Sequence, residues 1–148
     1  MNRILKVVCL LIFMCLPCAL LAQDDDSLQT TNVNDVDWNP VMDAIIQVES
    51  RGNAKAVSGN SCGAMQITPI LVAECNNILK RRKSKKRFSL ADRFNIAKSK
   101  EMFLIIQSFH NPKNDIERAI RSWNGGMRYS IQRTQRYFEK VMSYLTKK

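Results

Sequence analysis

The sequence has few of the residues that build metal and redox centres. It contains one histidine, His110, and three of its five cysteines fall within the first 22 residues. A lone histidine without neighbouring ligands does not form a metal site, so we expect no metal, no cofactor and a surface position for His110. Strand-like alternation of apolar and polar residues is absent, as are internal repeats, and a mainly α fold class is therefore expected.

Long apolar runs are scarce as well. The run at 7–21 is nearly continuous, but it is too short and wrongly flanked for a membrane span. Basic residues precede it, and Ala22 offers a small side chain for cleavage, which is typical of a secretory signal peptide. We predict that residues 1–22 are a signal peptide, that the mature chain is exported to the periplasm or cell envelope, and that this chain has no transmembrane span.

The segment at 23–37 is polar and contains three consecutive aspartates. Such a composition cannot bury enough apolar surface to fold, so we predict a flexible acidic leader. The remaining residues, 38–148, suffice for one domain with a modest core.

Positive charge is in excess. Loss of the first 22 residues removes Arg3 and Lys6 and lowers the formal net charge from +10 to +8. In the run 80–87, seven of eight residues are basic. This run is interpreted as a contact for an anionic polymer, as a nucleic-acid patch, or as a solvated loop, and the loop is favoured because no aromatic residue is interleaved for base stacking. Export argues against nucleic acid as a partner.

A helix carrying a carboxylic acid is predicted at 39–49. Asn39-Pro40 is a helix-start signal, with Asn39 as the cap, and Gly52 is placed to end the helix. Glu49 lies at the edge of the apolar stripe, so it cannot point fully into water. The stripe itself has the spacing i, i+3, i+4 and i+7 and consists of Val41, Ala44, Ile45 and Val48.

Half-burial has a chemical consequence for Glu49. Burial disfavours an ionised carboxylate and raises its pKa, and a carboxyl that stays protonated near neutral pH can donate a proton to a leaving group. The alternative interpretation is an ordinary helix-terminal glutamate in solvent.

Further helices are predicted from periodicity and caps. One begins at Met65, and one runs long from a capping box formed by Ser89 and Asp92, with Asn95 inside it. Another follows a cap at Asn114. Their predicted core residues, with those of a last helix over 134–145, are Ile67, Ile70, Leu71, Ala73, Ile78, Leu79, Phe94, Ala97, Glu101, Leu104, Ile105, Phe109, Ile116, Ala119, Ile120, Trp123, Phe138, Val141, Met142 and Leu145.

Motifs in the chain resemble those of the soluble lytic transglycosylases, a family that shares its fold with goose-type lysozymes. Four sets of residues carry the resemblance, and they occur in the family's order. They are Glu49-Ser50 with Asn53, Ala56, Ser58, Gly63-Ala64-Met65-Gln66-Ile67 and Pro69; Asn95-Ile96; Trp123-Asn124-Gly125-Gly126; and Thr134 with Tyr137, Phe138 and Val141. The resemblance implies a lysozyme-like helical domain with a substrate cleft.

The resemblance also implies an activity, which is cleavage of the β-1,4 bond between N-acetylmuramic acid and N-acetylglucosamine in peptidoglycan, with formation of 1,6-anhydromuramoyl ends. Glu49 would be the general acid and base. No second acidic residue falls inside 50–66 or 123–137. This count suits a substrate-assisted mechanism, but goose-type lysozymes also centre on one Glu and release ordinary reducing ends.

Supporting roles follow from the resemblance and from side-chain chemistry. Ser50 and Gln66 can donate hydrogen bonds near the carboxyl and the acetamido group, and Met65 can form an apolar floor for a sugar. Asn124 is expected to bind the glycan. For Tyr137 the resemblance implies a hydroxyl that orients the catalytic carboxyl, and for Asn95 it implies packing behind the cleft.

Three positions depart from the family pattern. Trp123, which belongs to the expected sugar site, replaces a Tyr; Gly125 replaces an Ala; and Ala64 stands where Leu is usual. None of these changes removes a reactive group. The two glycines at 125 and 126 are expected to let the backbone approach a ligand closely.

Two cysteines, Cys62 and Cys75, lie beyond the predicted signal peptide. Export permits a disulfide between them, and two buried thiols are the alternative. A bridge requires a short separation of the two Cα atoms, so both alternatives stay open.

The sequence leaves three candidate functions open. The first is an exported lytic transglycosylase, with a secretion or conjugation apparatus as a candidate partner, and the second is a hydrolytic lysozyme. The third is a catalytically weak glycan-binding scaffold, which predicts indifference to Glu49→Gln and sensitivity to changes at Asn124.

Overall fold

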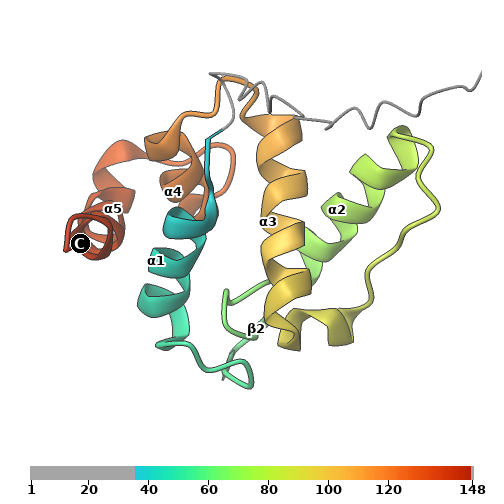
Figure 1. The fold of residues 1–148 in the computed structure, drawn as a ribbon, viewed down its shortest axis with the longest axis horizontal. Coiled ribbons are helices and arrows are strands. Elements are labelled where there is room, and N and C mark those ends of the chain that lie inside the picture. Colours follow the sequence, from blue (N-terminus) through green and yellow to red (C-terminus); the bar gives the residue numbers. More distant parts are fainter. Residues whose placement is uncertain (1–35, 148) are drawn as a thin grey trace, which may run out of the picture. The chain divides into compact units, whose positions relative to one another are not determined.

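The computed structural model describes residues 36–147, and the predicted signal peptide and nearly all of the predicted leader lie outside them. Over the described residues the fold is mainly α, as predicted, with five α-helices (Figure 1). In chain order the elements are α1 (Asn39–Ser50), β1 (Val57–Ser58), β2 (Ser61–Cys62), α2 (Pro69–Arg81), the 3₁₀-helix η1 (Leu90–Phe94), α3 (Ile96–His110), α4 (Ile116–Gly125) and α5 (Ile131–Leu145).

Helix α1 carries its predicted apolar stripe, but its first residues differ from the prediction. The N-cap position is Trp38, and the Asp37 carboxylate accepts a hydrogen bond from the Asn39 backbone N–H at 2.9 Å. Asn39 is therefore not the cap, because the neighbouring carboxylate satisfies a free N–H of the first turn. At the other end Arg51 takes a left-handed conformation with φ 56°, one residue before Gly52.

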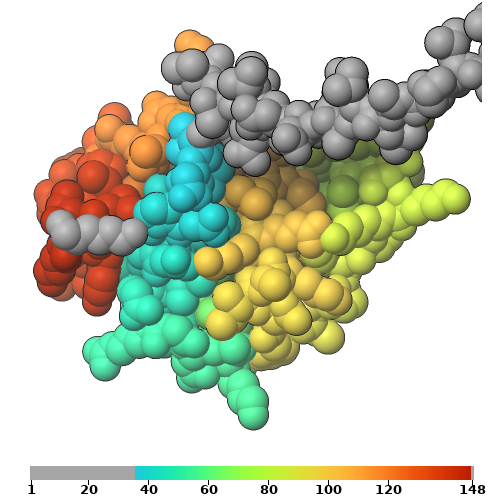
Figure 2. Space-filling model, in the orientation of Figure 1, coloured from blue at the N-terminus to red at the C-terminus, as the bar shows by residue number. Residues whose placement is uncertain are grey.

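The segment between α1 and α2 forms a short hairpin followed by a turn, and it projects from the lower edge of the face shown in Figure 2. Strands β1 and β2 pair antiparallel, and Cys62 forms a further bridge with Ile67. The helix predicted from Met65 instead begins at Pro69, because the Thr68 hydroxyl caps it by accepting from the Leu71 N–H at 3.3 Å.

The predicted inner face of α2 is partly wrong. Ile70 is 82% exposed and Ala73 is exposed, whereas Val72 and Cys75 are buried in addition to the predicted Ile78 and Leu79. The buried residues follow the three- and four-residue spacing of one helical face, and Ile70 and Ala73 lie off that face.

The long helix predicted from Ser89 is two elements. The Ser89–Asp92 capping box is present, but it caps the short η1. Asn95 then caps α3, because its side chain accepts from the Lys98 N–H at 3.0 Å. Asn95 is exposed, so the expectation that it packs behind the cleft is wrong.

The buried face of α3 also differs from the predicted one. Phe94, Ala97, Leu104 and Phe109 are exposed and Glu101 is partly exposed, so most of the predicted face was wrong, although Ile105 is buried. The face that packs inward is made of Ser99, Met102, Phe103, Ile105, Ile106 and Gln107.

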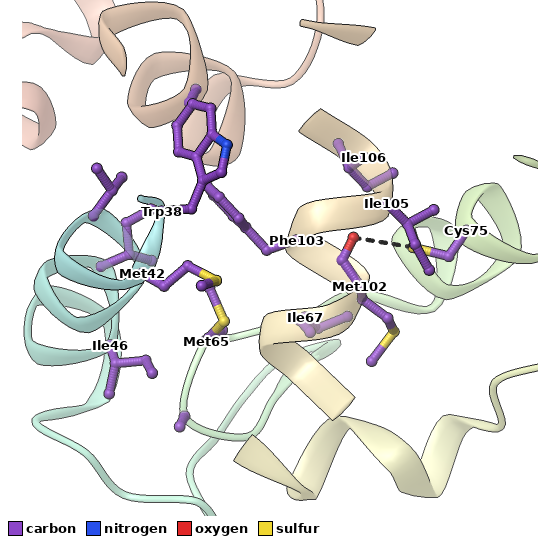
Figure 3. Close-up of a cluster of buried hydrophobic side chains, with 14 of the residues drawn as sticks. Trp38, Met42, Ile46, Met65, Ile67, Cys75, Met102, Phe103, Ile105 and Ile106 are labelled. Atoms are coloured by element: carbon purple, nitrogen blue, oxygen red, sulfur yellow. Dashed lines mark hydrogen bonds between the residues drawn. The ribbon is translucent and has the colours of Figure 1, made fainter. Parts of the chain in front are cut away.

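The core gathers around Phe103 (Figure 3). Its ring meets Trp38 edge-on at 5.7 Å between centroids and Trp123 at 5.2 Å. These contacts join the start of α1 and the end of α4 to α3, which itself packs on α2. Such aromatic pairs contribute about 0.5–1.5 kcal/mol beyond the area they bury.

Cys62 and Cys75 are both buried free thiols, so the structure has the unbonded alternative rather than the disulfide. The Cys75 thiol donates to the Met102 carbonyl at 3.5 Å (Figure 3). Burial, with nearby Glu74, raises the pKa of Cys75 to about 12, which keeps this thiol protonated.

The last two helices deviate little from the prediction. The cap of α4 is Asp115 instead of Asn114, since the Asp115 carboxylate accepts from the Arg118 N–H at 3.0 Å. Ala119 and Ile120 are buried as predicted, but Ile116 is 40% exposed. Helix α5 begins at Ile131, three residues before the predicted start, and Val141 lies fully inside.

All seven basic side chains of the run 80–87 are exposed. Three of them contact α3, where Lys86 pairs with Glu101, Arg82 donates to the Ser108 hydroxyl at 3.0 Å and the Arg81 guanidinium lies 5.3 Å from the centre of the Phe109 ring. The exposure agrees with the solvated-loop interpretation, and a role for the run in binding stays untested.

A buried arginine joins α4 to α5. Arg121 is 3% exposed, and its Nε donates to the Glu117 carboxylate at 2.6 Å. The guanidinium also stacks over the Phe138 ring at 4.3 Å. Its remaining hydrogen bonds reach α5, at the Ile131 carbonyl, the Thr134 hydroxyl and the Gln135 amide oxygen.

We expect Arg121→Met to lower the free energy of unfolding by about 2–4 kcal/mol, because three acceptors on α5 lose a charged donor. Urea denaturation followed by circular dichroism measures the loss. Arg133→Met is the matched control, since Arg133 is exposed on α5 and the same change there should stay within about 0.5 kcal/mol. Equal losses in the two variants would contradict the bridging role of Arg121.

Candidate active site

Glu49 and Tyr137 lie together although 88 residues separate them in the chain. Glu49 is in the last turn of α1 and Tyr137 is in the second turn of α5, and these helices pack against each other. The Tyr137 hydroxyl donates a hydrogen bond to Glu49 Oε1 at 2.7 Å. Helix packing therefore fixes the orientation of the carboxyl through one short contact.

The surroundings of Glu49 shift its protonation. Burial raises the pKa of Glu49 above its ordinary value of 4.5, while the hydrogen bond from Tyr137 lowers it by a smaller amount. The predicted half-burial and raised pKa are thus confirmed. Burial and the adjacent carboxylate raise the pKa of Tyr137, so its phenol stays protonated and remains a donor.

The carboxyl of Glu49 opens into a cavity of about 270 Å³. Its walls come from α1, the β1–β2 turn, the start of α2 and the end of α4. The lining residues are Glu49, Ser58, Ser61, Gln66, Thr68, Leu71, Trp123 and Asn124. Hydroxyl and amide groups predominate among them, which suits a ligand rich in hydroxyl and amide groups.

Glu49 is the one carboxyl among the residues that line this cavity. A glycosidase with two catalytic carboxylates places them about 5–10 Å apart across the scissile bond. The site therefore offers one proton-transfer group. This group can serve as both acid and base only in two successive steps.

Ser50 does not hydrogen-bond Glu49. Its hydroxyl donates to the Ala64 carbonyl at 2.8 Å, which ties the end of α1 to the turn before α2. Gln66 lines the cavity in a left-handed conformation with φ 50°, and its amide donates to the Gly63 carbonyl at 3.0 Å. The Ser50 hydroxyl therefore positions the turn and does not donate a hydrogen bond to the Glu49 carboxyl.

Met65 cannot form the apolar floor for a sugar, because its side chain is fully buried in the core (Figure 3). Its backbone carbonyl instead accepts a hydrogen bond from the Trp123 indole N–H at 3.2 Å. Trp123 is partly buried and lines the cavity, so the substitution for the family's Tyr keeps an aromatic wall.

Asn124 is exposed and lines the cavity beside Trp123. The following glycine serves the protein rather than a ligand. A Cβ on Gly125 would lie 2.8 Å from both the Thr134 and the Tyr129 side chains, so this glycine is required for close packing of the turn on α5. The departure from Ala at this position has a structural reason.

Sequence reasoning missed several residues of the site. Ser61, Thr68 and Leu71 line the cavity, and Thr68 could have been recognised by the cap signal Thr-Pro. It also missed Arg93, which is 9% exposed and ties η1 to the turns of the site. Its guanidinium donates to the carbonyls of Leu90, Asn60 and Ile67 at 2.8, 3.0 and 3.3 Å.

Two absences hold for residues 36–147. No group of three or more His, Cys, Asp or Glu side chains there is placed to hold a metal ion. His110 ends α3, and its Nε2 lies 2.9 Å from the Glu74 carboxylate. Over the same residues no helix has both the length and the apolar character needed to cross a membrane.

Comparison with protein families identifies the chain. Residues 28–145 match the family model described as the transglycosylase SLT domain, and the protein therefore belongs to this family. No curated protein and no solved structure matches the chain significantly. Family membership supports a peptidoglycan-cleaving function of the lytic transglycosylase type, with peptidoglycan as the substrate, and it agrees with a location in the cell envelope.

Proposed function

We propose that this protein is a lytic transglycosylase in which Glu49 is the sole general acid and base. It cleaves the β-1,4 bond between N-acetylmuramic acid and N-acetylglucosamine and leaves a 1,6-anhydromuramoyl end. The observation that carries the proposal is a half-buried carboxyl of raised pKa, held by Tyr137 at the wall of a cavity that has no second carboxyl.

In the first step the protonated Glu49 donates its proton to the glycosidic oxygen. The bond from this oxygen to the anomeric carbon of the muramoyl residue breaks, and the carbonyl oxygen of the sugar's own 2-acetamido group bonds to that carbon. The raised pKa of Glu49 supports this role, because a carboxyl must be protonated to act as the acid.

In the second step Glu49, now a carboxylate, accepts the proton of the muramoyl 6-hydroxyl. The oxygen of that hydroxyl bonds to the anomeric carbon, and the bond to the acetamido oxygen breaks. The carboxyl regains the proton that it gave, and no water is consumed. The same group thus serves as acid and then as base.

Other residues of the cavity have binding and positioning roles in this proposal. Tyr137 orients the carboxyl, and Gln66 and Asn124 contact the glycan, with Trp123 as an aromatic wall. Ser50 acts indirectly, through the turn that it ties to α1. Met65 has a core role.

Tyr137→Phe tests the orienting contact. The variant loses a hydrogen bond that lowers the Glu49 pKa, so the alkaline limb of kcat/KM should move to higher pH. The rate at the optimum should fall about tenfold, from a hydrogen bond of roughly 1.4 kcal/mol. A pH profile on purified peptidoglycan measures both effects. Tyr144→Phe, exposed on the same helix, is the control, and an alkaline limb that does not move in Tyr137→Phe would contradict the orienting role.

The mass of the products tests the proposed reaction. Muropeptides released from purified peptidoglycan should be lighter by one water than the products of hydrolysis. Reducing-end products would make the protein a hydrolytic lysozyme. A binding protein that releases no products would instead fit the glycan-binding scaffold.

The proposal includes a place for the reaction. Residues 1–22 direct export, the enzyme works in the periplasm or cell envelope, and it opens the wall locally for a secretion or conjugation apparatus. The apolar run at 7–21 and the excess of basic residues support export and an anionic wall polymer.

A further inference from the structure

The basic run at 80–87 is held on the domain at both of its ends. Its first two residues belong to the last turn of α2, and the Ser84 N–H donates to the Leu79 carbonyl at 2.9 Å. Just beyond the run, the Asn76 side chain accepts from the N–H of Phe88 at 2.8 Å and donates to its carbonyl at 2.9 Å. Phe88 itself is buried. The backbone of the run is therefore fixed between these two anchors.

Positive charge on this part of the surface is mostly uncompensated. Residues 76–109 contain ten basic residues and two acidic ones, Asp92 and Glu101. Both carboxylates already pair with a lysine, Lys98 and Lys86 respectively. In the part of the chain that the structure describes, the other six basic side chains of the run form no ion pair, and all of them are exposed. The run thus presents six cations to solvent.

Side chains of the run lie along an exposed face of α3. Lys86 pairs with Glu101, and Arg82 donates to the Ser108 hydroxyl at 3.0 Å. Glu101, Leu104 and Ser108 are three and four residues apart, so they share one face of the helix. Leu104 is 40% exposed on this face. The contacts of the two cations therefore lie on both sides of an exposed leucine.

Other exposed apolar side chains border the run. The Arg81 guanidinium lies 5.3 Å from the centre of the Phe109 ring, which is 37% exposed. In η1, which follows the run in the chain, Leu90 is 50% exposed. No residue of the run lines the Glu49 cavity. Cations and apolar side chains thus occur together on a surface that is separate from the candidate active site.

This combination distinguishes between anionic partners. Lysine and arginine clusters beside exposed leucine and phenylalanine are typical of proteins that bind anionic membrane surfaces. Single-stranded nucleic acid is bound by basic grooves with aromatic rings on which the bases stack, and no aromatic residue lies within the run. Exposed leucines contribute nothing to the binding of a polyanion in water, whereas they can enter the headgroup region of a bilayer.

We propose that the basic run at 80–87 and the exposed face of α3 bind a membrane surface of anionic phospholipid. The lysines and arginines of the run contact the headgroup phosphates. Leu104, Phe109 and Leu90 lie against the boundary between the headgroups and the acyl chains. The membrane is thus a second partner of the domain, bound outside the Glu49 cavity.

Vesicle binding tests the proposal. The protein as purified from cells is titrated with mixed vesicles of phosphatidylcholine and phosphatidylglycerol at physiological salt. Vesicles of phosphatidylcholine alone measure any contribution from the apolar run at 7–21. The mixed vesicles are expected to bind the protein more tightly, with an affinity that falls as salt is added.

Simultaneous substitution of Lys80, Lys83 and Lys85 by Gln tests the run itself. Within the described residues these three side chains make no hydrogen bond or ion pair, so the fold should not change. A lysine near an anionic membrane contributes about fivefold to the affinity. The triple variant should therefore bind the mixed vesicles about 100-fold more weakly than the wild type.

The matched control substitutes Lys113, Lys140 and Lys147 by Gln. These lysines are also exposed, and the change removes the same charge from other parts of the surface. Because salt screens charges that lie beyond about 8 Å from the membrane, the affinity of this variant should fall by less than about threefold.

Leu104→Ser tests the apolar part of the surface. It should weaken binding to the mixed vesicles about three- to fivefold and leave binding to double-stranded DNA unchanged. Ile131→Ser is its control, since Ile131 is 64% exposed on α5, away from the run in the chain.

Equal losses in the two triple variants, or equal binding to anionic and neutral vesicles, would overturn the proposal. Tighter binding to DNA than to the mixed vesicles, unaffected by Leu104→Ser, would also overturn it and would make the run a polyanion site. These results are independent of the proposed reaction, because vesicle binding requires no turnover.

Discussion

Glu49→Gln is expected to lower the rate of product release from peptidoglycan by about 10²–10⁴-fold. The amide has nearly the volume of the carboxyl and can still accept from Tyr137, but it cannot donate a proton to the glycosidic oxygen or accept one from the 6-hydroxyl. Glu139→Gln, the same change at an exposed position of α5, should leave the rate unchanged. The rate is measured by chromatography of released muropeptides.

This loss should occur without loss of stability. The pKa of Glu49 is raised in the folded protein, so the contribution of Glu49 to stability is fully present below its ordinary pKa of 4.5 and is lost as the pH rises through the raised pKa. Gln does not ionise, and the variant should be at least as stable as the wild type at neutral pH, with a smaller difference in acid. Thermal melts at several pH values check this. The melts show that the variant is folded, so that a lost rate reflects the missing carboxyl. A folded Glu49→Gln variant that keeps its activity would contradict acid catalysis by Glu49.

Gly63→Ala is expected to lower the free energy of unfolding by more than about 4 kcal/mol, which is exceptional for one methyl group. A Cβ at Gly63 would lie 1.7 Å from the Arg93 backbone oxygen, and φ is +79°. Relief of the overlap requires the turn to move away from η1. This movement breaks the hydrogen bonds that Arg93 donates to the Ile67 and Asn60 carbonyls. Urea denaturation followed by circular dichroism gives the loss.

Gly59→Ala separates the two causes. Gly59 also has a positive φ, +56°, but a Cβ there would meet nothing within 4 Å. Its cost should be only the backbone term, about 1–2 kcal/mol. Similar losses in the two variants would contradict a steric requirement at Gly63.

The position of Glu49 at the edge of an apolar stripe could be predicted from the sequence alone, because the apolar residues of α1 keep a regular period over about two turns. Its contact with Tyr137 could not be predicted this way. The two residues are far apart in the chain, and only the family resemblance brought Tyr137 into consideration. Helix packing, which periodicity does not encode, supplies that contact.

The errors in the helix starts have a common physical origin in caps and backbone turns. A cap at Asn95 instead of Ser89 moved the start of α3, and a cap at Thr68 left Met65 outside α2. Side chains that satisfy distant backbone groups, such as Arg93, have no local signal at all. Their partners are assembled only when the chain folds.

The most direct test of the account is digestion of peptidoglycan in water enriched in the heavy isotope of oxygen, with wild-type protein and with Glu49→Gln. The account predicts wild-type products that end in 1,6-anhydromuramoyl and carry no heavy oxygen, because the ring oxygen comes from the sugar's own 6-hydroxyl. The variant should release almost none. Wild-type products with heavy oxygen at a reducing end would show that water attacks the anomeric carbon, and this result would contradict the transglycosylase reaction.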